Sequence, residues 1–214
     1  MEPMNCTAKW TPDKCEVWVP TQNGDASLAA TSAASGLKPE QCEVYKIHLG
    51  GGFGRRATPT SDFVAEAVIV AKAAGLPVKT VWTREDDIQH GFYHTVTAER
   101  FEAGLDASNK VVAWRHRSAA PSFMANFVPD PKHPGDIELG MGWVDTPFNV
   151  PNMRMESGEA QSHLRVGWFR SVNNVAHAWS IQSFIAELAS QLGKDPKDFL
   201  LEMIGPARIV DVAK

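Results

Sequence analysis

The feature that most constrains the fold of this chain is a run of glycines at residues 50–54, which reads Gly-Gly-Gly-Phe-Gly. Residues 42–49 before it alternate in polarity and predict a strand, with Val44 and Ile47 as its core residues. Residues 61–74 after it carry apolar side chains at helical spacing. Glycines adopt backbone conformations that are closed to residues with a Cβ atom, and they let amides come close to a ligand. A glycine loop between a strand and a helix therefore predicts a cradle for an anionic group.

The rest of the first ninety residues continues the alternation of strands and helices. Residues 15–20 predict a strand, and residues 78–82 predict another. Between them we expect Asp25 to cap a small-residue helix over residues 26–35. The helix after the loop is expected to bury an apolar stripe formed by Phe63, Val64, Ala67, Val68 and Ala71. This order is typical of an α/β layer arrangement.

The second half of the chain predicts a hairpin, an irregular stretch and two helices. Residues 96–105 and 111–119 alternate in polarity and form the hairpin, whereas residues 121–151 are rich in proline, glycine and aspartate and lack periodicity. Residues 173–192 and 195–203 predict helices. We therefore expect an α+β fold in which a mixed sheet carries helices on one face.

Three parts are expected along the chain. An α/β part with the glycine loop covers residues 1–119, an irregular connection covers residues 120–160, and a helical part covers residues 161–214. No apolar run approaches the roughly 20 residues that a membrane-spanning helix needs, so we expect no transmembrane segment in this chain.

Charge and cysteine content exclude further classes of protein. The formal net charge is -4, and the only adjacent arginines are Arg55 and Arg56, so we expect no nucleic-acid partner. The three cysteines, Cys6, Cys15 and Cys42, form no CxxC pair, and we expect buried or idle thiols rather than a metal site.

The glycine loop allows other interpretations. Residues 52–57 fit the G-x-G-x-x-A pattern of a dinucleotide-binding loop, with Glu85 as the acidic partner. Against this, Pro59 delays the helix that the glycines should open, and Glu85 lies further along than the roughly 20 residues expected. Gly50 and Gly51 also have no role in that motif. A loop that only turns a corner is the structural alternative.

Three ordered segments carry a more specific signal than the loop alone. They are residues 19–23 (Val-Pro-Thr-Gln-Asn), 50–54, and 168–171 (Trp-Phe-Arg-Ser). Together they resemble the cofactor-binding segments of the large subunit of molybdenum hydroxylases, the family of xanthine dehydrogenase and aldehyde oxidoreductase. Residues 1–5, the arginine pair after the loop and residues 170–172 are most similar to the isoquinoline 1-oxidoreductase branch. The resemblance runs over essentially the whole chain.

This resemblance implies a molybdopterin cofactor with molybdenum, and it assigns cofactor contacts to positions of this chain. Gln22 matches a glutamine whose side-chain amide hydrogen-bonds an oxygen ligand of the molybdenum. It is not itself a ligand of the metal, and as a neutral donor it adds no charge. Arg170 matches an arginine whose guanidinium fork suits phosphate and pterin oxygens. The loop whose main-chain amides meet the cofactor matches Gly51, Gly52, Phe53 and Gly54.

Two positions depart from the purine-oxidising members of the family. Those members have a glutamate where this chain has Ala57 and a phenylalanine where it has Val172. Both residues are therefore substrate-pocket candidates. We expect an N-heteroaromatic compound or an aldehyde as the substrate, oxidised with water as the oxygen source. The family's catalytic glutamate has no counterpart here, Glu202 included, so no catalytic residue is assigned to this chain.

The resemblance also implies what surrounds the chain. We expect an internal piece of a large subunit, inactive by itself, in which Met1 is not the native start. Its expected partners are the remainder of the large subunit, a small subunit with iron–sulfur clusters, and a small-molecule substrate. The branch favours the cytosine dinucleotide form of molybdopterin and the periplasm, with the cytoplasm as the alternative compartment. Two other functions stay open: an NAD- or FAD-binding module that uses Gly52, Gly54 and Ala57, and a non-catalytic interaction domain.

Overall fold

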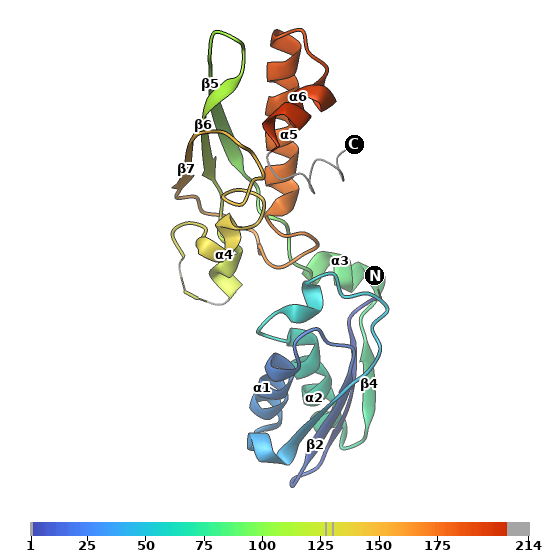
Figure 1. The fold of residues 1–214 in the computed structure, drawn as a ribbon. Helices are drawn as coiled ribbons and strands as arrows, with labels where there is room; N and C mark the ends of the chain where they lie inside the picture. Colours follow the sequence, from blue (N-terminus) through green and yellow to red (C-terminus); the bar gives the residue numbers. More distant parts are fainter. Residues whose placement is uncertain (1, 127, 130, 205–214) are drawn as a thin grey trace. The chain divides into compact units, whose positions relative to one another are not determined.

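The computed structural model describes residues 2–126, 128–129 and 131–204 of the 214-residue chain (Figure 1). The chain forms two compact units. The first comprises Met1–Tyr93, Asn126–Pro129 and Leu164–Arg170, and the second comprises His94–Ala125, Asp130–His163 and Ser171–Lys214. Because residues 164–170 return to the first unit, the third motif segment up to Arg170 belongs to the same unit as the glycine loop.

The first unit is built on a four-stranded mixed sheet with the order β3-β2-β1-β4. Its strands are β1 (Asn5–Trp10), β2 (Cys15–Val19), β3 (Cys42–Lys46) and β4 (Val78–Val81). β1 pairs antiparallel with β2 and β4, whereas β2 and β3 run parallel. The helices α1 (Gly24–Ser35) and α2 (Asp62–Ala74) lie on one face of this sheet (Figure 1). α1 is the crossover connection that the parallel pair requires.

The core of the first unit lies between this sheet and α2. Successive side chains of a strand point to opposite faces, so alternate residues of β1 and β2 face the helix. The fully buried residues are Met4, Cys6, Ala8, Cys15, Val17, Val19, Phe63, Val64, Ala67, Val68 and Ala71. All five residues predicted for the stripe of α2 are among them. Burial of a Val or Phe side chain contributes about 1.5–3 kcal/mol, so α2 firmly anchors the chain that follows the glycine loop.

α1 packs through small and polar residues instead of an apolar stripe. Its buried side chains are Ser27, Thr31 and Ser35. The helix is capped by Asn23, whose Oδ1 accepts a hydrogen bond from the Ala26 amide at 3.1 Å. The expectation that Asp25 caps this helix is therefore wrong. Asn23 directly follows Gln22 in the chain, so the cap also fixes the backbone beside Gln22.

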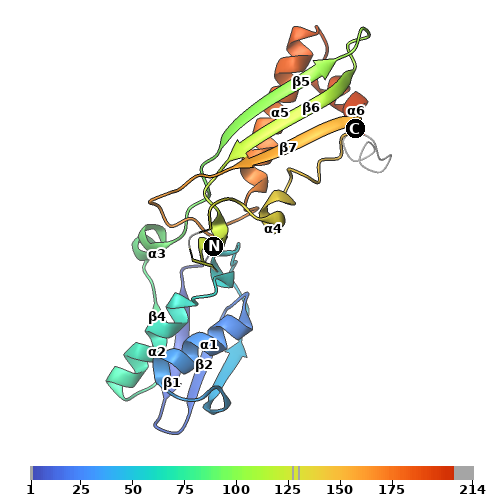
Figure 2. The same cartoon turned by 90° about the vertical axis from the view of Figure 1, so that its left-hand side faces the viewer.

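The second unit holds a three-stranded sheet with the order β5-β6-β7. Its strands are β5 (Ala98–Leu105), β6 (Val111–Ala119) and β7 (Asn152–Gly158). β5 and β6 form the predicted antiparallel hairpin, and β7 runs parallel to β6. The helices α5 (Asn174–Gln191) and α6 (Pro196–Met203) pack on this sheet through a core that includes Trp114, Ile185 and Phe199 (Figure 2). Shorter elements of the chain are η1 (Pro39–Gln41), η2 (Arg55–Ala57), α3 (Arg84–His90), η3 (Phe123–Asn126) and α4 (Asp136–Leu139).

The α+β class with mixed sheets is confirmed, but several details differ from the sequence-based expectation. β1, α3 and β7 are elements that the sequence patterns do not predict, and β7 lies inside the stretch expected to be irregular. Ile47 is 44% exposed because β3 ends at Lys46, so its expected place in the core is wrong. Val44 does pack against the core. The hairpin expected in the first part of the chain belongs to the second compact unit. Among the described residues, no helix has both the length and the apolar character needed to cross a bilayer.

Candidate functional site

The glycine loop leaves β3 and turns sharply before the 3-10 turn η2. Gly51 and Gly54 have φ angles of 99° and 90°, and Phe53 between them has a φ of 50°. Positive φ is uncommon for a residue with a Cβ atom, so the surrounding structure must hold Phe53 in place. Two turn hydrogen bonds close the loop: the Arg55 amide donates to Gly52 O at 3.1 Å, and the Ala57 amide donates to Gly54 O at 2.9 Å.

Two of the glycines let other segments come close to the loop backbone. A Cβ atom on Gly52 would lie 2.4 Å from Gln22 Oε1. A Cβ atom on Gly54 would lie 3.0 Å from the carbonyl oxygen of Trp168, and the φ of Gly54 is itself in the left-handed region. The loop is therefore the meeting point of the three motif segments predicted from the sequence.

Gln22 reaches the loop from the end of β2. Its backbone amide donates to Arg56 O at 3.1 Å, and its side-chain Oε1 accepts from the Gly54 amide at 2.9 Å. Because Oε1 is used in this way, the Nε2 group is the part of the amide left to donate to a ligand. The side chain of Gln22 is exposed. Its position therefore suits the role of a neutral hydrogen-bond donor at the loop.

Arg170 approaches the loop from the third segment. Its amide donates to Phe53 O at 2.8 Å, and its guanidinium carbon lies 4.5 Å from the centroid of the Phe53 ring. The backbone before it is tied to Tyr93, whose amide donates to Arg165 O at 2.8 Å and whose carbonyl accepts from the Gly167 amide at 3.1 Å. Phe53 is 43% exposed and serves as the platform on which the exposed Arg170 side chain rests.

The site presents several donors that have no acceptor within the described part of the chain. The backbone amides of Gly51, Gly52 and Phe53, the Nε2 of Gln22 and the guanidinium of Arg170 make no hydrogen bond to a described residue. Gly52 is buried, where an unpaired amide is costly. Such a set of neutral donors with one cation at the same loop suits a ligand that is rich in oxygen acceptors and carries negative charge.

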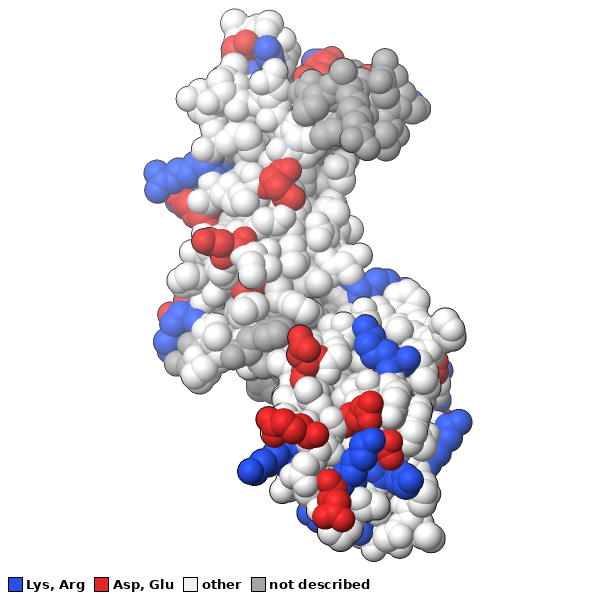
Figure 3. All heavy atoms as spheres, turned by 60° about the horizontal axis from the view of Figure 1, so that its bottom comes forward, with Lys and Arg blue, Asp and Glu red and all other residues white. Residues whose placement is uncertain are grey.

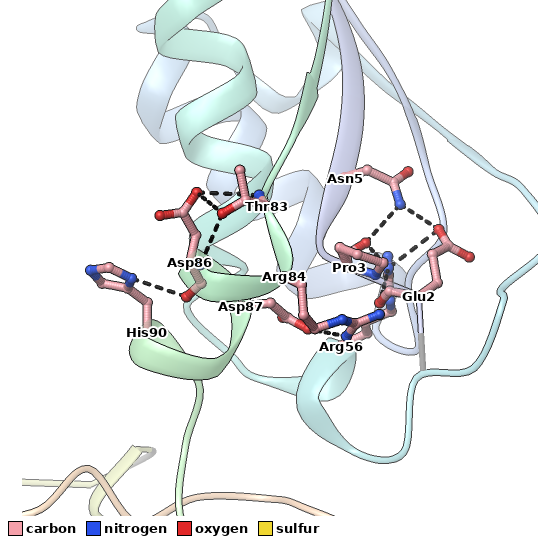
Figure 4. Close-up of polar contacts among 9 residues, drawn as sticks. All are labelled: Glu2, Pro3, Asn5, Arg56, Thr83, Arg84, Asp86, Asp87 and His90. Atoms are coloured by element: carbon pink, nitrogen blue, oxygen red, sulfur yellow. Dashed lines mark hydrogen bonds and ion pairs between the residues drawn. The ribbon is translucent and has the colours of Figure 1, made fainter.

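Two arginines that follow the loop are buried beneath it, which the sequence patterns do not predict. Arg56 is fully buried, and its Nη1 donates to Pro20 O at 2.8 Å. Its Nη2 donates to Pro3 O at 2.8 Å (Figure 4). An ion pair of 3.3 Å joins Nη2 to Glu2. Burial lowers the pKa of Arg56, although the nearby charges of Glu2 and Asp87 oppose that shift.

The other arginine, Arg55, makes its side-chain contacts with residues outside the loop. Its guanidinium makes a bidentate pair with Asp62 at 3.0 and 2.7 Å, and it lies over the rings of Trp82 and Phe92 at 5.6 and 4.9 Å. It thereby braces the start of α2 against the chain after β4. The signal that could have revealed this pairing is the acidic first turn of α2, seven residues further along.

Glu2 holds the entry of the loop. Burial by itself would raise the pKa of Glu2, but hydrogen bonds from Asn5 and the Gly50 amide, together with the charge of Arg56, lower it. The carboxylate is therefore charged at neutral pH, and the positive charge of Arg56 lies within ion-pair distance of it.

On the face drawn in Figure 3, acidic and basic side chains are interspersed.

The two substrate-pocket candidates lie in different compact units. Ala57 is half-buried in η2 of the first unit, and its carbonyl accepts from Asn23 Nδ2 at 3.3 Å. Val172 belongs to the second unit, where it and Ser171 have φ angles of 48° and 64°. Within the described ranges, no three His, Cys, Asp or Glu side chains gather as they would around a metal ion.

The dinucleotide interpretation of the loop is not favoured by this geometry. α2 begins only at Asp62, and the 3-10 turn η2 and the left-handed Ser61 intervene between the last glycine and the helix. The glycines therefore do not open the helix, as they do in a dinucleotide-binding loop.

Comparisons with known proteins add independent findings. Residues 1–202 match the family model described as molybdopterin cofactor-binding domain. The chain is 28% identical over 209 residues to isoquinoline 1-oxidoreductase subunit beta of Brevundimonas diminuta, covering 94% of this chain and 26% of that protein. It is 32% identical over 191 residues to a membrane-bound aldehyde dehydrogenase of Gluconacetobacter polyoxogenes, covering 83% of this chain and 24% of that protein. The chain thus spans about a quarter of the length of these curated relatives.

Solved structures show the same fold. The aldehyde oxidoreductase from Desulfovibrio gigas matches with a TM-score of 0.75 at 20% identity, over 96% of this chain and 22% of that one. Quinoline 2-oxidoreductase from Pseudomonas putida 86 matches with a TM-score of 0.73 at 17% identity, over 97% of this chain and 27% of that one.

Proposed function

Because this chain belongs to the molybdopterin cofactor-binding domain family, we propose that its glycine loop, Gln22 and Arg170 form part of the cradle for a molybdenum cofactor. The observation that carries this proposal is the meeting of three distant segments at one loop. The Gly54 amide binds Gln22 Oε1, and Phe53 O binds the Arg170 amide. The donors that remain unpaired at this point suit the oxygens of a pterin and its phosphate.

Each residue has a distinct task in this proposal. Gln22 Nε2 donates a neutral hydrogen bond, which stabilises an acceptor without adding charge. The amides of Gly52 and Phe53 line the floor of the cradle, and Arg170 neutralises negative charge while Phe53 fixes its direction. The cofactor, when bound, supplies the two-electron redox chemistry, and this chain supplies binding and orientation. We assign no catalytic residue to this chain.

The proposed reaction is the hydroxylation of an N-heteroaromatic compound or the oxidation of an aldehyde, with water as the oxygen source. The names of the relatives support both classes, since they include isoquinoline 1-oxidoreductase and aldehyde oxidoreductase. Ala57 and Val172 are the two positions proposed, from the family resemblance, to select the substrate, and neither side chain offers a polar group that would hold a purine.

The surroundings of the cradle are also proposals. We infer that the cofactor has the cytosine dinucleotide form and that electrons leave through iron–sulfur clusters on a small partner subunit. The family resemblance supports both inferences, and the relatives named as subunits support an assembly of several chains. The periplasm is the proposed compartment on the same resemblance.

The test of the reaction class uses the protein purified from its own host. We expect it to oxidise isoquinoline, nicotinate or benzaldehyde with an artificial electron acceptor, and to take the new oxygen atom from isotopically labelled water. Xanthine is the control substrate and is expected to be a poor one, because Ala57 and Val172 leave no polar partner for it. Product without label from water would contradict the reaction class. Xanthine turnover as fast as that of the other substrates would contradict the substrate class.

A further inference from the structure

We propose that Arg56 is a positioning residue that fixes the glycine loop and Gln22 in one arrangement before any ligand binds. This inference rests on the proposed function for what the loop binds. The arrangement itself, however, is a property of the described residues. Arg56 is buried and makes no hydrogen bond with the unpaired donors, so it acts through the segments that it joins.

The side chain of Arg56 joins two segments that are distant in sequence. Its Nη1 donates to Pro20 O at 2.8 Å, at the end of β2. Its Nη2 donates to Pro3 O at 2.8 Å and to Glu2 O at 3.3 Å, in the chain before β1 (Figure 4). These acceptors are backbone carbonyls in different directions, which suits a planar guanidinium fork and not the single ammonium group of a lysine.

The backbone of Arg56 holds the Gln22 segment a second time. Its carbonyl accepts from the Gln22 amide at 3.1 Å and from Thr21 Oγ1 at 3.3 Å. The side chain and the main chain of Arg56 thus both form hydrogen bonds with the stretch from Pro20 to Gln22. These hydrogen bonds position the Gln22 side chain where it accepts from the Gly54 amide.

Glu2 connects Arg56 to the first residue of the loop, Gly50. Its amide donates to Gly50 O at 3.1 Å, and its carboxylate accepts from the Gly50 amide. Because the same carboxylate pairs with Arg56, the second residue after the loop is connected to the residue at its start. The entry of the loop, its exit and the Gln22 segment are therefore connected through Arg56 and its ion-pair partner Glu2.

The first experiment compares Arg56→Lys with wild type by site-resolved amide hydrogen exchange. The Gly54 amide reports the Gln22 contact, and the Gly50 amide reports the Glu2 contact. In Arg56→Lys we expect both to exchange about tenfold faster or more, while amides of the β1–β2 pair stay within about twofold of wild type. The matched control is Val68→Ala. It weakens the core of the first unit and removes none of the hydrogen bonds described for the loop.

A purely structural role would give a different pattern. If Arg56→Lys accelerates exchange in β1, β2 and the loop alike, as Val68→Ala does, or leaves Gly50 and Gly54 unchanged, the positioning role is wrong. If Arg56→Lys does not fold, Glu2→Gln decides, since it keeps the arginine. Because the Gly50 amide bonds Glu2 directly, the Gly54 amide is the readout in this variant. The proposal requires faster exchange at Gly54 with an intact core, and an unchanged Gly54 amide overturns it.

A second readout separates this inference from the proposed function. We expect Arg56→Lys, folded but with a loosened loop, to retain less pterin per chain than Val68→Ala. If wild type itself contains no pterin, the proposed function fails, whereas the exchange pattern still decides whether Arg56 positions the loop.

Discussion

At the scale of single residues, the geometry of the site depends on how closely Gln22 and Gly52 approach each other. The Gln22 side chain lies over Gly52 because the glycine has no Cβ atom, and this closeness lets Oε1 accept from the Gly54 amide. The atoms that a Cβ on Gly52 would meet all belong to the flexible end of the Gln22 side chain. A larger residue at position 52 therefore displaces Gln22 more readily than it distorts the backbone.

Gly52→Ala is accordingly expected to change the geometry of the site while leaving the stability of the fold nearly unchanged. We expect the free energy of unfolding to fall by no more than about 1 kcal/mol, because a flexible side chain can move aside. The Gln22 contact is expected to be lost, which faster exchange of the Gly54 amide would show. Gly75→Ala is the control, since nothing lies near that glycine and the alanine is disfavoured there only by the positive φ. A Gly54 amide that exchanges at the wild-type rate in Gly52→Ala would contradict this account.

The site residues were predictable because they lie in short motifs, whereas the residues that hold them were not. Gln22, the glycines and Arg170 meet in the structure, as the three motif segments imply. The burial of Arg56 could not be inferred, because its acceptors are backbone carbonyls at Pro3 and Pro20, which leave no trace in the amino-acid pattern. Whether the site residues bind a cofactor stays a prediction.

At the scale of elements, strong local periodicity predicts the structure and non-local pairing does not. The stripe of α2 and the β5–β6 hairpin are confirmed because both are encoded by neighbouring residues. β7 was missed because its partner β6 lies more than thirty residues earlier. Its outward-facing residues are also charged, as in the pair between Arg117 and Glu156. In α5, Trp179 is 74% exposed although it fits the apolar spacing, since spacing does not tell which face is covered.

The buried pair between β5 and β6 gives a pH-dependent prediction for the second unit. Glu99 accepts from the buried His116 ring at 2.6 Å and from Ser118 Oγ at 2.9 Å. Burial by itself would raise the pKa of Glu99, but these hydrogen bonds outweigh it and lower the pKa below its ordinary value of 4.5. A carboxyl whose pKa is lower in the folded state stabilises the fold above its unfolded pKa, and this contribution is lost as the pH falls further.

Glu99→Gln is therefore expected to cost most stability near neutral pH. Its difference from wild type in free energy of unfolding should shrink as the pH falls below 4.5 and through the lowered folded-state pKa. Urea unfolding of both proteins at several pH values measures this difference. Glu187→Gln, at an exposed position of α5, is the control and is expected to differ little from wild type at any pH. A Glu99→Gln difference that does not change with pH would show that the carboxylate contributes nothing through its charge.

At the scale of the whole molecule, family membership covers nearly the entire chain, while the chain spans about a quarter of its curated relatives. The compact units do not follow the order of the sequence, because residues 164–170 return to the first unit. That return brings Arg170 to the glycine loop, as the motif segments imply, although periodicity alone does not predict it. We therefore propose that the loop, Gln22 and Arg170 of the first unit together hold a molybdenum cofactor.

The most direct test of this claim is the molybdenum and pterin content of the protein purified from its own host. We would measure wild type beside the double variant Gln22→Ala, Arg170→Ala. The matched control is Gln191→Ala, Arg100→Ala, which removes the same side chains at exposed positions outside the site. The account predicts about one molybdenum per chain in wild type and control, and the loss of most of it in the double variant. Wild type without molybdenum or pterin, while other molybdoenzymes of the host are loaded, would contradict it, as would full content in the double variant.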